Sequence, residues 1–396
     1  MPRFPVRLVA WLPRALSRGC LRTALAPMLS WLAGPMHADA TPLRVQLTGQ
    51  SLIKHDLRAV HAGEFPALTG FLRAGAPHVS FTNLETAIEG PFGGTPTRQN
   101  EYQHAADPVV LDCLKELGFN LLSTGNNHSW DLGTPGILST LLEVDRRGFI
   151  RAGTGRNLGE ASAPAFLETP AGRVALVALA SGRLRPGAAA TAERPGVNEV
   201  RLDAERRLIV EDAERVFAAI RFAATQARTV IVYQHDHYWE ENRLLTPDWK
   251  KNFARACIDA GAAVFVSHGV PQLHGLEIYR NRPIFYGLGS LIFHTITKPG
   301  HYAPEVWQSV VADLELRDGR VAEIRLRPVL LNEHGADPAR FNETRGAPRP
   351  ARGADARRVL EHFAAQSAEF GTVLLYDGDA ARVALPPATL STNQPR

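Results

Sequence analysis

The sequence is poor in cysteine and has no long apolar run. Only three of its 396 residues are cysteines, and no stretch approaches the roughly 18 consecutive apolar residues that a membrane-spanning helix needs. A glycine-rich loop followed by lysine, which cradles nucleotide phosphates, is also missing. These absences argue against a transmembrane segment in the mature chain and against ATP-driven ligation by this protein.

Excess basic charge is also missing once the N-terminus is set aside. The whole chain has a pI of about 9.1, with 44 basic and 40 acidic residues. Residues 1–40 hold five arginines and one acid, so the remainder carries 39 residues of each sign. No basic patch is left that would support nucleic-acid binding, and we expect no nucleic-acid partner.

Residues 1–40 have the composition of an export signal. An arginine-rich stretch precedes an apolar run at residues 24–33, and Ala38-Asp39-Ala40 fits an A-x-A cleavage site. We predict that residues 1–40 are a signal peptide and that the mature chain is periplasmic or held in the cell envelope. The alternatives are an N-terminal amphipathic helix, or a wrongly assigned start codon on a cytoplasmic phosphodiesterase.

Removal of this leader would take Cys20 away and leave Cys113 and Cys257. An exported chain can form a disulfide between them. Each of the two lies in an apolar helical pattern, however, which equally favours two buried free thiols.

Strand-like and helix-like segments alternate over most of the chain. Strands are expected near residues 44–47, 79–83, 120–123, 149–152, 174–180, 229–233 and 263–266, and helices over 108–117, 134–147, 204–227 and 250–260. Alternation of this kind predicts a layered α/β domain, which we place at residues 41–333. Two long loops, roughly 86–104 and 181–203, are expected to carry function.

The C-terminal part differs in composition. Residues 334–352 are rich in Gly, Pro, Ala and Arg, which is typical of a linker or long surface loop. A helix over 354–370 and a short hairpin around Asp377-Gly378-Asp379 are predicted to follow. We expect residues 334–396 to pack on the main domain as this linker, helix and hairpin.

Polar side chains follow four of the predicted strands, at the point where each strand ends. They are Asn83 and Glu85, then Asn127 and His128, then His235, Asp236 and His237, and finally His268. Loops at the carboxyl ends of strands in an α/β sheet converge on one crevice. Imidazole, carboxylate and amide oxygen suit Zn²⁺, Mn²⁺ or Fe, and such an ion polarises a phosphoryl or acyl oxygen. The pattern predicts a site for one or two divalent ions.

Each of these residues has an ordinary structural explanation when it is taken alone. A single histidine after a strand is more often a hydrogen-bonding loop residue, and Glu85 alone would be a solvated acid. The pair Asn126-Asn127 suits a turn, because asparagine tolerates left-handed backbone. Only the repetition of such strand endings in one domain favours a metal site.

Four segments carry a family resemblance. They are residues 83–85 (Asn-Leu-Glu), 125–133 (Gly-Asn-Asn-His-Ser-Trp-Asp-Leu-Gly), 195–198 (Pro-Gly-Val-Asn) and 275–290, which contains Pro-Ile-Phe-Tyr-Gly-Leu-Gly. In order and spacing they resemble the motifs of CapA-like proteins, a family associated with capsule and poly-γ-glutamate synthesis. The resemblance runs from about Leu43 to Leu331. It implies an α/β calcineurin-like metallophosphatase fold, in which two packed β-sheets are flanked by helices.

The resemblance also implies roles for individual residues. The metal ligands would be Glu85, Asn127, His235 and His268. We add His237 as a candidate ligand, because it follows the same predicted strand as His235. His128 would act beside the substrate as general acid or oxyanion stabiliser. Asp131 would orient His128, as carboxylates do for catalytic imidazoles.

The sequence departs from the family pattern at several ligand positions. Gln50 stands where the family has an aspartate ligand, and a neutral amide binds a divalent cation less tightly. Gly269 and Pro271 stand where the family has later histidines. Asp236, His237 or His274 could restore the number of ligands. We therefore expect Gln50 to be a doubtful ligand, and the site to be reduced or rearranged from a full two-metal centre.

Two functions of different classes fit these observations. One is a metal-dependent hydrolase acting on a phosphoester or a polymer amide. The other is a non-catalytic accessory protein that supports transport or attachment of an anionic capsular polymer. Its partners would then be that polymer or the envelope synthesis machinery.

Several further side chains near these motifs suit more than one role. Tyr238, Trp239 and Trp249 fit loop packing better than a substrate groove. Lys54, Arg98 and Arg156 could bind a polyanion, but a solvated side chain is the simpler interpretation. Asp56 is expected to cap a helix.

Overall fold

The computed structural model describes residues 41–98 and 103–386. These residues belong to one compact unit. The predicted signal peptide, residues 1–40, lies outside the described residues. No helix among the described residues is long and apolar enough to cross a membrane.

One sheet has nine strands and mixes parallel and antiparallel pairs. Its parallel part consists of β1 (Leu43–Leu47), β3 (Val79–Asn83), β6 (Leu121–Ser123) and β7 (Ile150–Ala152). Its antiparallel part consists of β17 (Gln308–Arg317), β18 (Arg320–Leu331), β19 (Pro348–Pro350), β20 (Leu374–Asp377) and β21 (Ala380–Val383). The two parts meet where β1 pairs with β17.

The second sheet has six strands in the order β14-β15-β13-β12-β10-β9. They are β9 (Ala165–Leu167), β10 (Val174–Ser181), β12 (Thr229–Asp236), β13 (Val264–His268), β14 (Leu273–Tyr279) and β15 (Arg282–Leu288). Every residue of β10, β12 and β13 is buried. Strands that are buried on both faces require these continuous apolar runs, which explains why their sequences do not alternate.

The two sheets pack face to face. Their shared core includes Leu47 and Phe81 from the first sheet and Ile231 and Tyr233 from the second. The rings of Phe81 and Tyr233 lie 5.3 Å apart between centroids, a contact distance for aromatic pairs.

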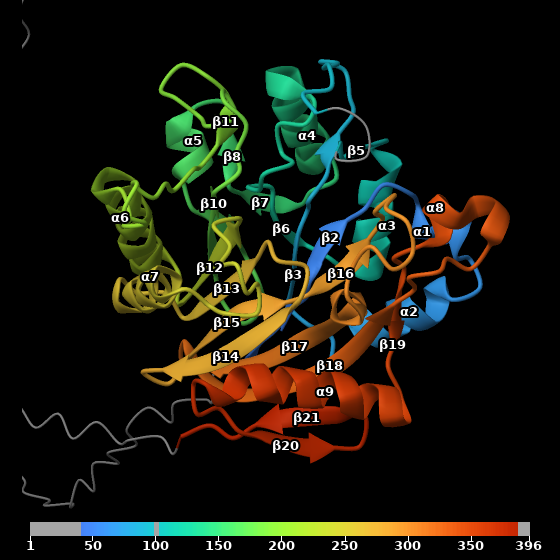
Figure 1. Cartoon of the computed structure of the whole chain (residues 1–396). Coiled ribbons are helices and arrows are strands. Elements are labelled where there is room, and N and C mark those ends of the chain that lie inside the picture. The colour runs from blue at the N-terminus through green and yellow to red at the C-terminus, as the bar shows by residue number, and fades with distance from the viewer. Residues whose placement is uncertain (1–40, 99–102, 387–396) are drawn as a thin grey trace, which may run out of the picture. The chain divides into compact units, whose positions relative to one another are not determined.

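Helices cover the outer faces of both sheets (Figure 1). The second sheet is covered by α6 (Val210–Gln226) and α7 (Asp248–Asp259). The first is covered by α1 (Leu57–Val60), α2 (Phe65–Arg73) and α3 (Val109–Leu117). The remaining helices are α4 (Gly133–Arg146), α5 (Leu158–Ser162), α8 (Phe341–Thr344) and α9 (Gly353–Ala368). This confirms the predicted α/β class, with two packed sheets flanked by helices.

Short strand pairs and 3-10 turns complete the described elements. β2 (Gln50–Leu52) pairs with β16 (Ser290–Phe293), β4 (Ala87–Ile88) with β5 (Ala105–Ala106), and β8 (Thr154–Gly155) with β11 (Gly196–Val197). The turns are η2 (Pro304–Trp307) and η3 (Pro338–Arg340).

Local sequence signals place several of these boundaries. α3 ends at Gly118, whose φ of 103° is left-handed, a conformation that glycine adopts without a steric penalty. Asp56 caps α1 by accepting a hydrogen bond from the Arg58 amide, as expected. Cys113 and Cys257 are both buried free thiols, so the disulfide that export would permit is absent.

The segment at residues 334–352 is more structured than its composition suggests. It contains η3, α8 and β19, and β19 adds to the first sheet by pairing with β18. Arg345 within it is fully buried, and its guanidinium lies 4.7 Å from the ring centre of Trp307. The composition of residues 334–352 predicted a linker. It did not predict β19, because this strand forms only by pairing with the distant β18.

Candidate metal centre

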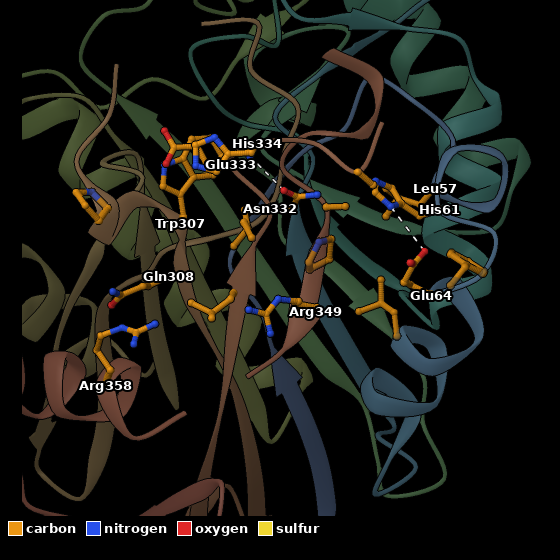
Figure 2. A pocket seen from close by; sticks show the side chains of 18 residues that line it. Leu57, His61, Glu64, Trp307, Gln308, Asn332, Glu333, His334, Arg349 and Arg358 are labelled. Carbon is orange, nitrogen blue, oxygen red and sulfur yellow. Dashed lines mark hydrogen bonds and ion pairs between the residues drawn. The ribbon is translucent and has the colours of Figure 1, made fainter. Parts of the chain in front are cut away.

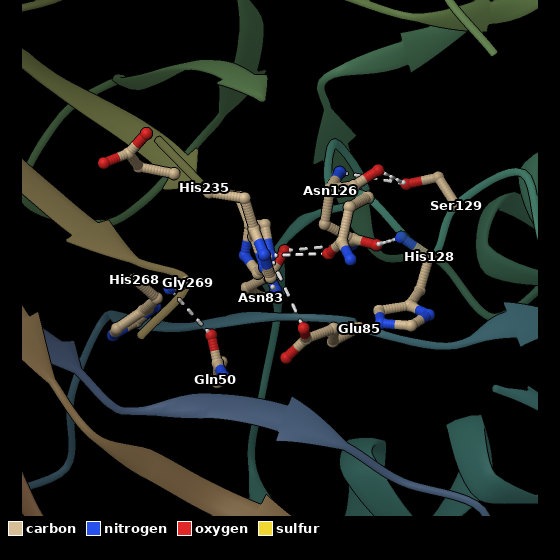
Figure 3. A network of polar contacts seen from close by, with 12 residues as sticks. Gln50, Asn83, Glu85, Asn126, His128, Ser129, His235, His268 and Gly269 are labelled. Carbon is tan, nitrogen blue, oxygen red and sulfur yellow. Dashed lines mark hydrogen bonds and ion pairs between the residues drawn. The ribbon is translucent and has the colours of Figure 1, made fainter. Parts of the chain in front are cut away.

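Strand ends from both sheets converge on one buried site. Asn83 closes β3, while His235 and His268 lie opposite each other where β12 and β13 end. Figure 3 shows these side chains together with Gln50 from β2 and Glu85 from the segment after β3. The two-sheet packing is what brings β3 and β12 together, since they belong to different sheets.

His235 is the hub of this site. Its Nε2 lies 2.9 Å from Asn127 Oδ1 and 3.0 Å from His237 Nε2. Glu85 Oε1 lies 3.4 Å from the same nitrogen. One ligand atom each from Glu85, His235 and His237 all fall within 4.8 Å of one another. These three residues form a cluster that could hold a metal ion.

Unpartnered polar atoms support the fit of a cation to this cluster. Glu85 Oε2 and His237 Nδ1 are buried and have no hydrogen-bond partner among the described residues. The 3.0 Å contact between the Nε2 atoms of His235 and His237 joins two groups that both serve as metal ligands in their neutral form. Nitrogen and oxygen donors of this kind suit a transition metal such as zinc, manganese or iron.

Burial keeps the cluster uncharged in the absence of a cation. Burial, with a smaller contribution from the nearby Asp131 carboxylate, raises the pKa of Glu85 to about 8. Burial also lowers the pKa of His235 and of His237 well below its ordinary value, and the neighbouring His128 adds to both shifts. A bound cation would supply the positive charge that favours ionised Glu85 and neutral imidazoles.

Beside this cluster, His128 is held by Asp131. The His128 Nδ1 atom lies 2.8 Å from Asp131 Oδ2. Asp131 also accepts hydrogen bonds from Arg98 Nε, at 2.6 Å, and from the His104 amide, at 2.7 Å. Burial, followed by the charges of Arg98 and Lys54, lowers the pKa of His128 well below its ordinary value. The imidazole is therefore neutral, and its Nδ1 side is held by Asp131.

Two of these neighbours were not anticipated from the sequence. The side chain of Arg98 is only 15% exposed, because it is bonded to Asp131 and to the backbone carbonyl of Asn127. The interpretation of Arg98 as a solvated side chain was therefore wrong. The His104 ring lies 4.1 Å from that of His128, and only its place in the long loop at 86–104 pointed to a role.

Asn126 has a structural role at the site. Its residue type suggested only a turn, but its side chain also makes long-range hydrogen bonds. Its Nδ2 donates to Asn83 Oδ1 at 3.2 Å and to the Leu84 carbonyl at 2.7 Å. Its Oδ1 accepts from the His128 amide at 3.0 Å. One side chain thus ties the end of β3 to the loop that carries Asn127 and His128.

Gln50 and His268 are not members of the three-residue cluster of ligand atoms. Gln50 Oε1 accepts a hydrogen bond from the Gly269 amide at 3.1 Å. Both ring nitrogens of His268 are buried without a partner among the described residues, and burial lowers its pKa to about 3. His268 is not among the residues whose ligand atoms cluster with those of Glu85. A neutral amide that is engaged by the backbone thus stands at position 50, where the resemblance expects a carboxylate ligand.

Asp236 and His274 take structural positions. Asp236 Oδ1 accepts hydrogen bonds from Ser181 Oγ and the Tyr238 amide, and Oδ2 lies 3.6 Å from Lys250 Nζ. His274 is buried and its Nδ1 lies 3.5 Å from Thr246 Oγ1. Neither residue joins the cluster of ligand atoms among the described residues.

A separate cavity of about 460 Å³ lies beside α1, α2 and the ends of β17 and β18 (Figure 2). Its lining includes His61, Glu64, Trp307 and Arg349. None of the residues of the candidate metal centre lines it. The chemistry suggested by the strand ends therefore belongs to the buried cluster and not to this cavity.

Comparison with known proteins shows which family this chain is similar to. Residues 45–295 match the family model described as "Bacterial capsule synthesis protein PGA_cap". The protein y4sH of Sinorhizobium fredii is 30% identical over an alignment 424 residues long. The alignment covers 82% of this chain and 89% of that relative. The PGA biosynthesis protein CapA of Bacillus subtilis is 29% identical over 52% of this chain and 53% of its own length. The probable polyglutamine synthesis accessory protein Rv0574c of Mycobacterium tuberculosis is 29% identical over 55% and 56%.

Proposed function

The chain belongs to the bacterial capsule synthesis family PGA_cap, and from this premise we propose that it is a metal-dependent hydrolase of the cell envelope. Its substrate would be a phosphoester, or an amide of a polymer such as poly-γ-glutamate. Two of its relatives are named for PGA biosynthesis and for polyglutamine synthesis. The observation that carries the proposal is the approach of Glu85, His235 and His237 to within 4.8 Å of one another. The buried Glu85 Oε2 and His237 Nδ1 atoms have no hydrogen-bond partner among the described residues, and unpaired buried polar atoms of this kind call for a functional explanation.

Glu85, His235 and His237 would hold the ion, and the Asn127 amide oxygen lies beside them. A divalent ion bound there would supply Lewis-acid polarisation of a phosphoryl or carbonyl oxygen. His128 would accept or deliver a proton at Nε2 while Asp131 holds the Nδ1 side. Arg98 keeps Asp131 in place, and the buried position of the whole group excludes bulk water from these contacts.

Metal content of the purified protein tests the proposal. We expect chain purified without chelators to carry a transition metal in stoichiometric amount, measured by inductively coupled plasma mass spectrometry. His235→Gln should lose it, because Nε2 is the hub of the cluster. His274→Gln is the matched control, since it changes an equally buried imidazole outside the cluster. Absence of metal from the unaltered chain would overturn the hydrolase proposal.

One observation favours a second function, that of a non-catalytic accessory protein for an anionic polymer. Gln50 is buried and its amide is engaged by Gly269 and Ser290, so the carboxylate expected at this position is replaced by a neutral structural group. If the chain binds metal but turns over neither phosphoesters nor γ-linked glutamate, the accessory role is the better account.

Export is the remaining part of the proposal. The arginine-rich stretch, the apolar run and Ala38-Asp39-Ala40 support cleavage of a leader. We expect N-terminal sequencing of the protein from an envelope fraction to begin at Thr41. A chain that keeps its N-terminus and stays in the cytoplasm would contradict this.

A further inference from the structure

The ring of Trp239 adjoins the candidate metal centre, and the guanidinium groups of two arginines lie over it. Its centroid lies 4.5 Å from that of His237, with the planes tilted by 30°. The guanidinium carbons of Arg183 and Arg243 lie 4.9 Å and 4.8 Å from the same centroid. Because His237 belongs to the metal cluster, both positive charges are one aromatic ring away from it.

The position of Trp239 is determined by its neighbours. Its indole N–H donates to the carbonyl of Asp236, the last residue of β12, at 2.9 Å. The Tyr238 amide donates to Asp236 Oδ1 at 3.0 Å. The half-buried ring is therefore a fixed surface at the rim of the site. Packing in the loop, which the sequence favoured for Trp239, accounts for its N–H but not for the two cations on the ring.

Arg183 is brought to the ring by an unusual backbone. β10 ends at Ser181, whose carbonyl accepts from the His237 amide at 2.7 Å. Gly182 and Arg183 then both have left-handed φ angles, 72° and 53°. A Cβ on Gly182 would lie 2.8 Å from the His237 carbonyl carbon, so only glycine allows this close approach. A left-handed arginine is uncommon, and such backbone is concentrated at functional positions.

Neither arginine has an acidic partner. No ion pair or side-chain hydrogen bond involves the guanidinium of Arg183 or Arg243 in the described part of the chain, and both residues are exposed. Some other exposed arginines are neutralised, as Arg156 is by Glu160 and Arg207 by Asp203. Both guanidiniums lie under 5 Å from one point, so they are less than about 10 Å apart, within a Debye length. Two like charges held this close create a local positive potential that attracts an anion.

We propose that Arg183 and Arg243, supported by the ring of Trp239, form an anion-binding subsite for the charged part of the substrate at the metal centre. This inference rests on the proposed function, because the subsite adjoins His237. Guanidinium groups match the oxygens of carboxylate and phosphate equally in geometry. The subsite would bind a carboxylate or phosphate group next to the bond presented to Glu85, His235 and His237.

Binding of two anions by calorimetry tests the proposal. The probes are inorganic phosphate and a short γ-linked glutamate oligomer, each titrated into the intact chain as purified and again after chelation. We expect Arg183→Gln and Arg243→Gln each to weaken binding about tenfold, the effect of losing one charge-assisted hydrogen bond. The double variant should lose more. Which probe the unaltered chain binds will show whether carboxylate or phosphate is the partner.

Arg280→Gln is the matched control. Arg280 also has a left-handed φ, 50°, and its guanidinium lies 5.4 Å from the ring centre of Tyr279. It is paired with Asp259 at 2.8 Å and lies outside the metal cluster. We expect its substitution to leave the affinity for both probes unchanged. Metal content and thermal midpoint, measured for all variants, should match those of the unaltered chain.

The outcomes separate this proposal from the metal proposal. Retained metal with unchanged anion affinity in the double variant would overturn the subsite and leave the hydrolase intact. Binding of neither probe by the unaltered chain would overturn the subsite as well. The chain purified without chelators could also carry no metal and still bind an anion through the two arginines. That result would support the subsite and overturn the hydrolase.

Discussion

His235 shows how a single imidazole collects groups from distant parts of the chain. Its Nε2 contacts Glu85, Asn127 and His237, and its Nδ1 lies 3.2 Å from the Tyr233 hydroxyl. Each of these groups stands at or near a strand end in the sequence. Their residue types therefore indicated a ligand set, while the distances depend on side-chain conformations that no sequence spacing determines.

Asp131, which holds the His128 ring beside the cluster, offers a test at the scale of a single residue. Asp131→Asn should leave metal content unchanged, since Asp131 is not in the cluster of ligand atoms. It should lower hydrolytic turnover about 10- to 100-fold, the usual effect of losing a carboxylate that orients a catalytic imidazole. Turnover of a generic phosphoester and the ¹⁵N shifts of the His128 ring, which report its tautomer, are the measurements. Unchanged ring shifts would contradict the orienting role.

Among the elements, β12 and β13 owe the close approach of their ends to one glycine. Gly269 directly follows β13 and has a φ of 126°. A Cβ at this position would lie only 1.8 Å from the Asp236 carbonyl oxygen. No side chain fits there unless the backbone moves, so the ends that carry His235 and His268 depend on this residue.

Gly269→Ala should therefore destabilise the fold by about 3 kcal/mol or more, because it adds a steric clash to a strained backbone. Gly371→Ala is its control, since Gly371 has a φ of 69° but no atom within 4 Å of a new Cβ. Strain alone should cost that variant only about 1–2 kcal/mol. Urea unfolding followed by circular dichroism measures both, and equal losses would refute the clash.

A second element, α6, is anchored through Asp212 in its first turn. Asp212 accepts hydrogen bonds from Arg201 and Arg215. Burial alone would raise the pKa of Asp212, but the hydrogen bonds from Arg201 and Arg215 outweigh it, so the pKa is lowered. The ionised form is therefore favoured in the folded chain.

Asp212→Asn should cost about 1–3 kcal/mol at neutral pH, the range for hydrogen bonds to charged groups. A lowered folded-state pKa gives stability that is present above the unfolded pKa, ordinarily near 3.8, and is lost as the pH falls through the folded value. The difference from the unaltered chain should thus shrink below about pH 4. Glu211→Gln, an exposed acid in the same turn, should show little effect at any pH.

On the scale of the whole molecule, the C-terminal elements complete the core between the sheets. Val359, Leu360 and Phe363 on α9 are fully buried in the same apolar cluster as Leu47 and Tyr233. α9 contacts β14 of one sheet and β18 of the other. Residues 353–386 therefore belong to the fold that holds the site.

A chain that ends at residue 352 should accordingly fold poorly, because removing α9 exposes these apolar side chains. We expect it to be insoluble or to lack a cooperative thermal transition. A chain that ends at residue 386 keeps every described element and should behave like the unaltered protein. Differential scanning calorimetry of the two shortened chains measures their thermal unfolding. A cooperative transition in the chain that ends at residue 352 would contradict the role of α9 in completing the core.

The sequence by itself determined the element types and the strand ends that bear ligands. Apolar runs specify buried strands such as β10 and β12, and glycines such as Gly118 end helices, because these effects are local. The motif order also identified the family, and the residue types Glu85, Asn127 and His235 indicated the chemistry.

Only the tertiary structure decided which candidates meet. Packing of the sheets brings Glu85, after β3, to His235 and His237, while Gln50 and His268 are not members of that cluster of ligand atoms. It also pairs Arg98 with Asp131 and places Arg183 and Arg243 on Trp239. These contacts join residues that are far apart in the chain, and their distances follow from how two sheets pack, which no local pattern encodes.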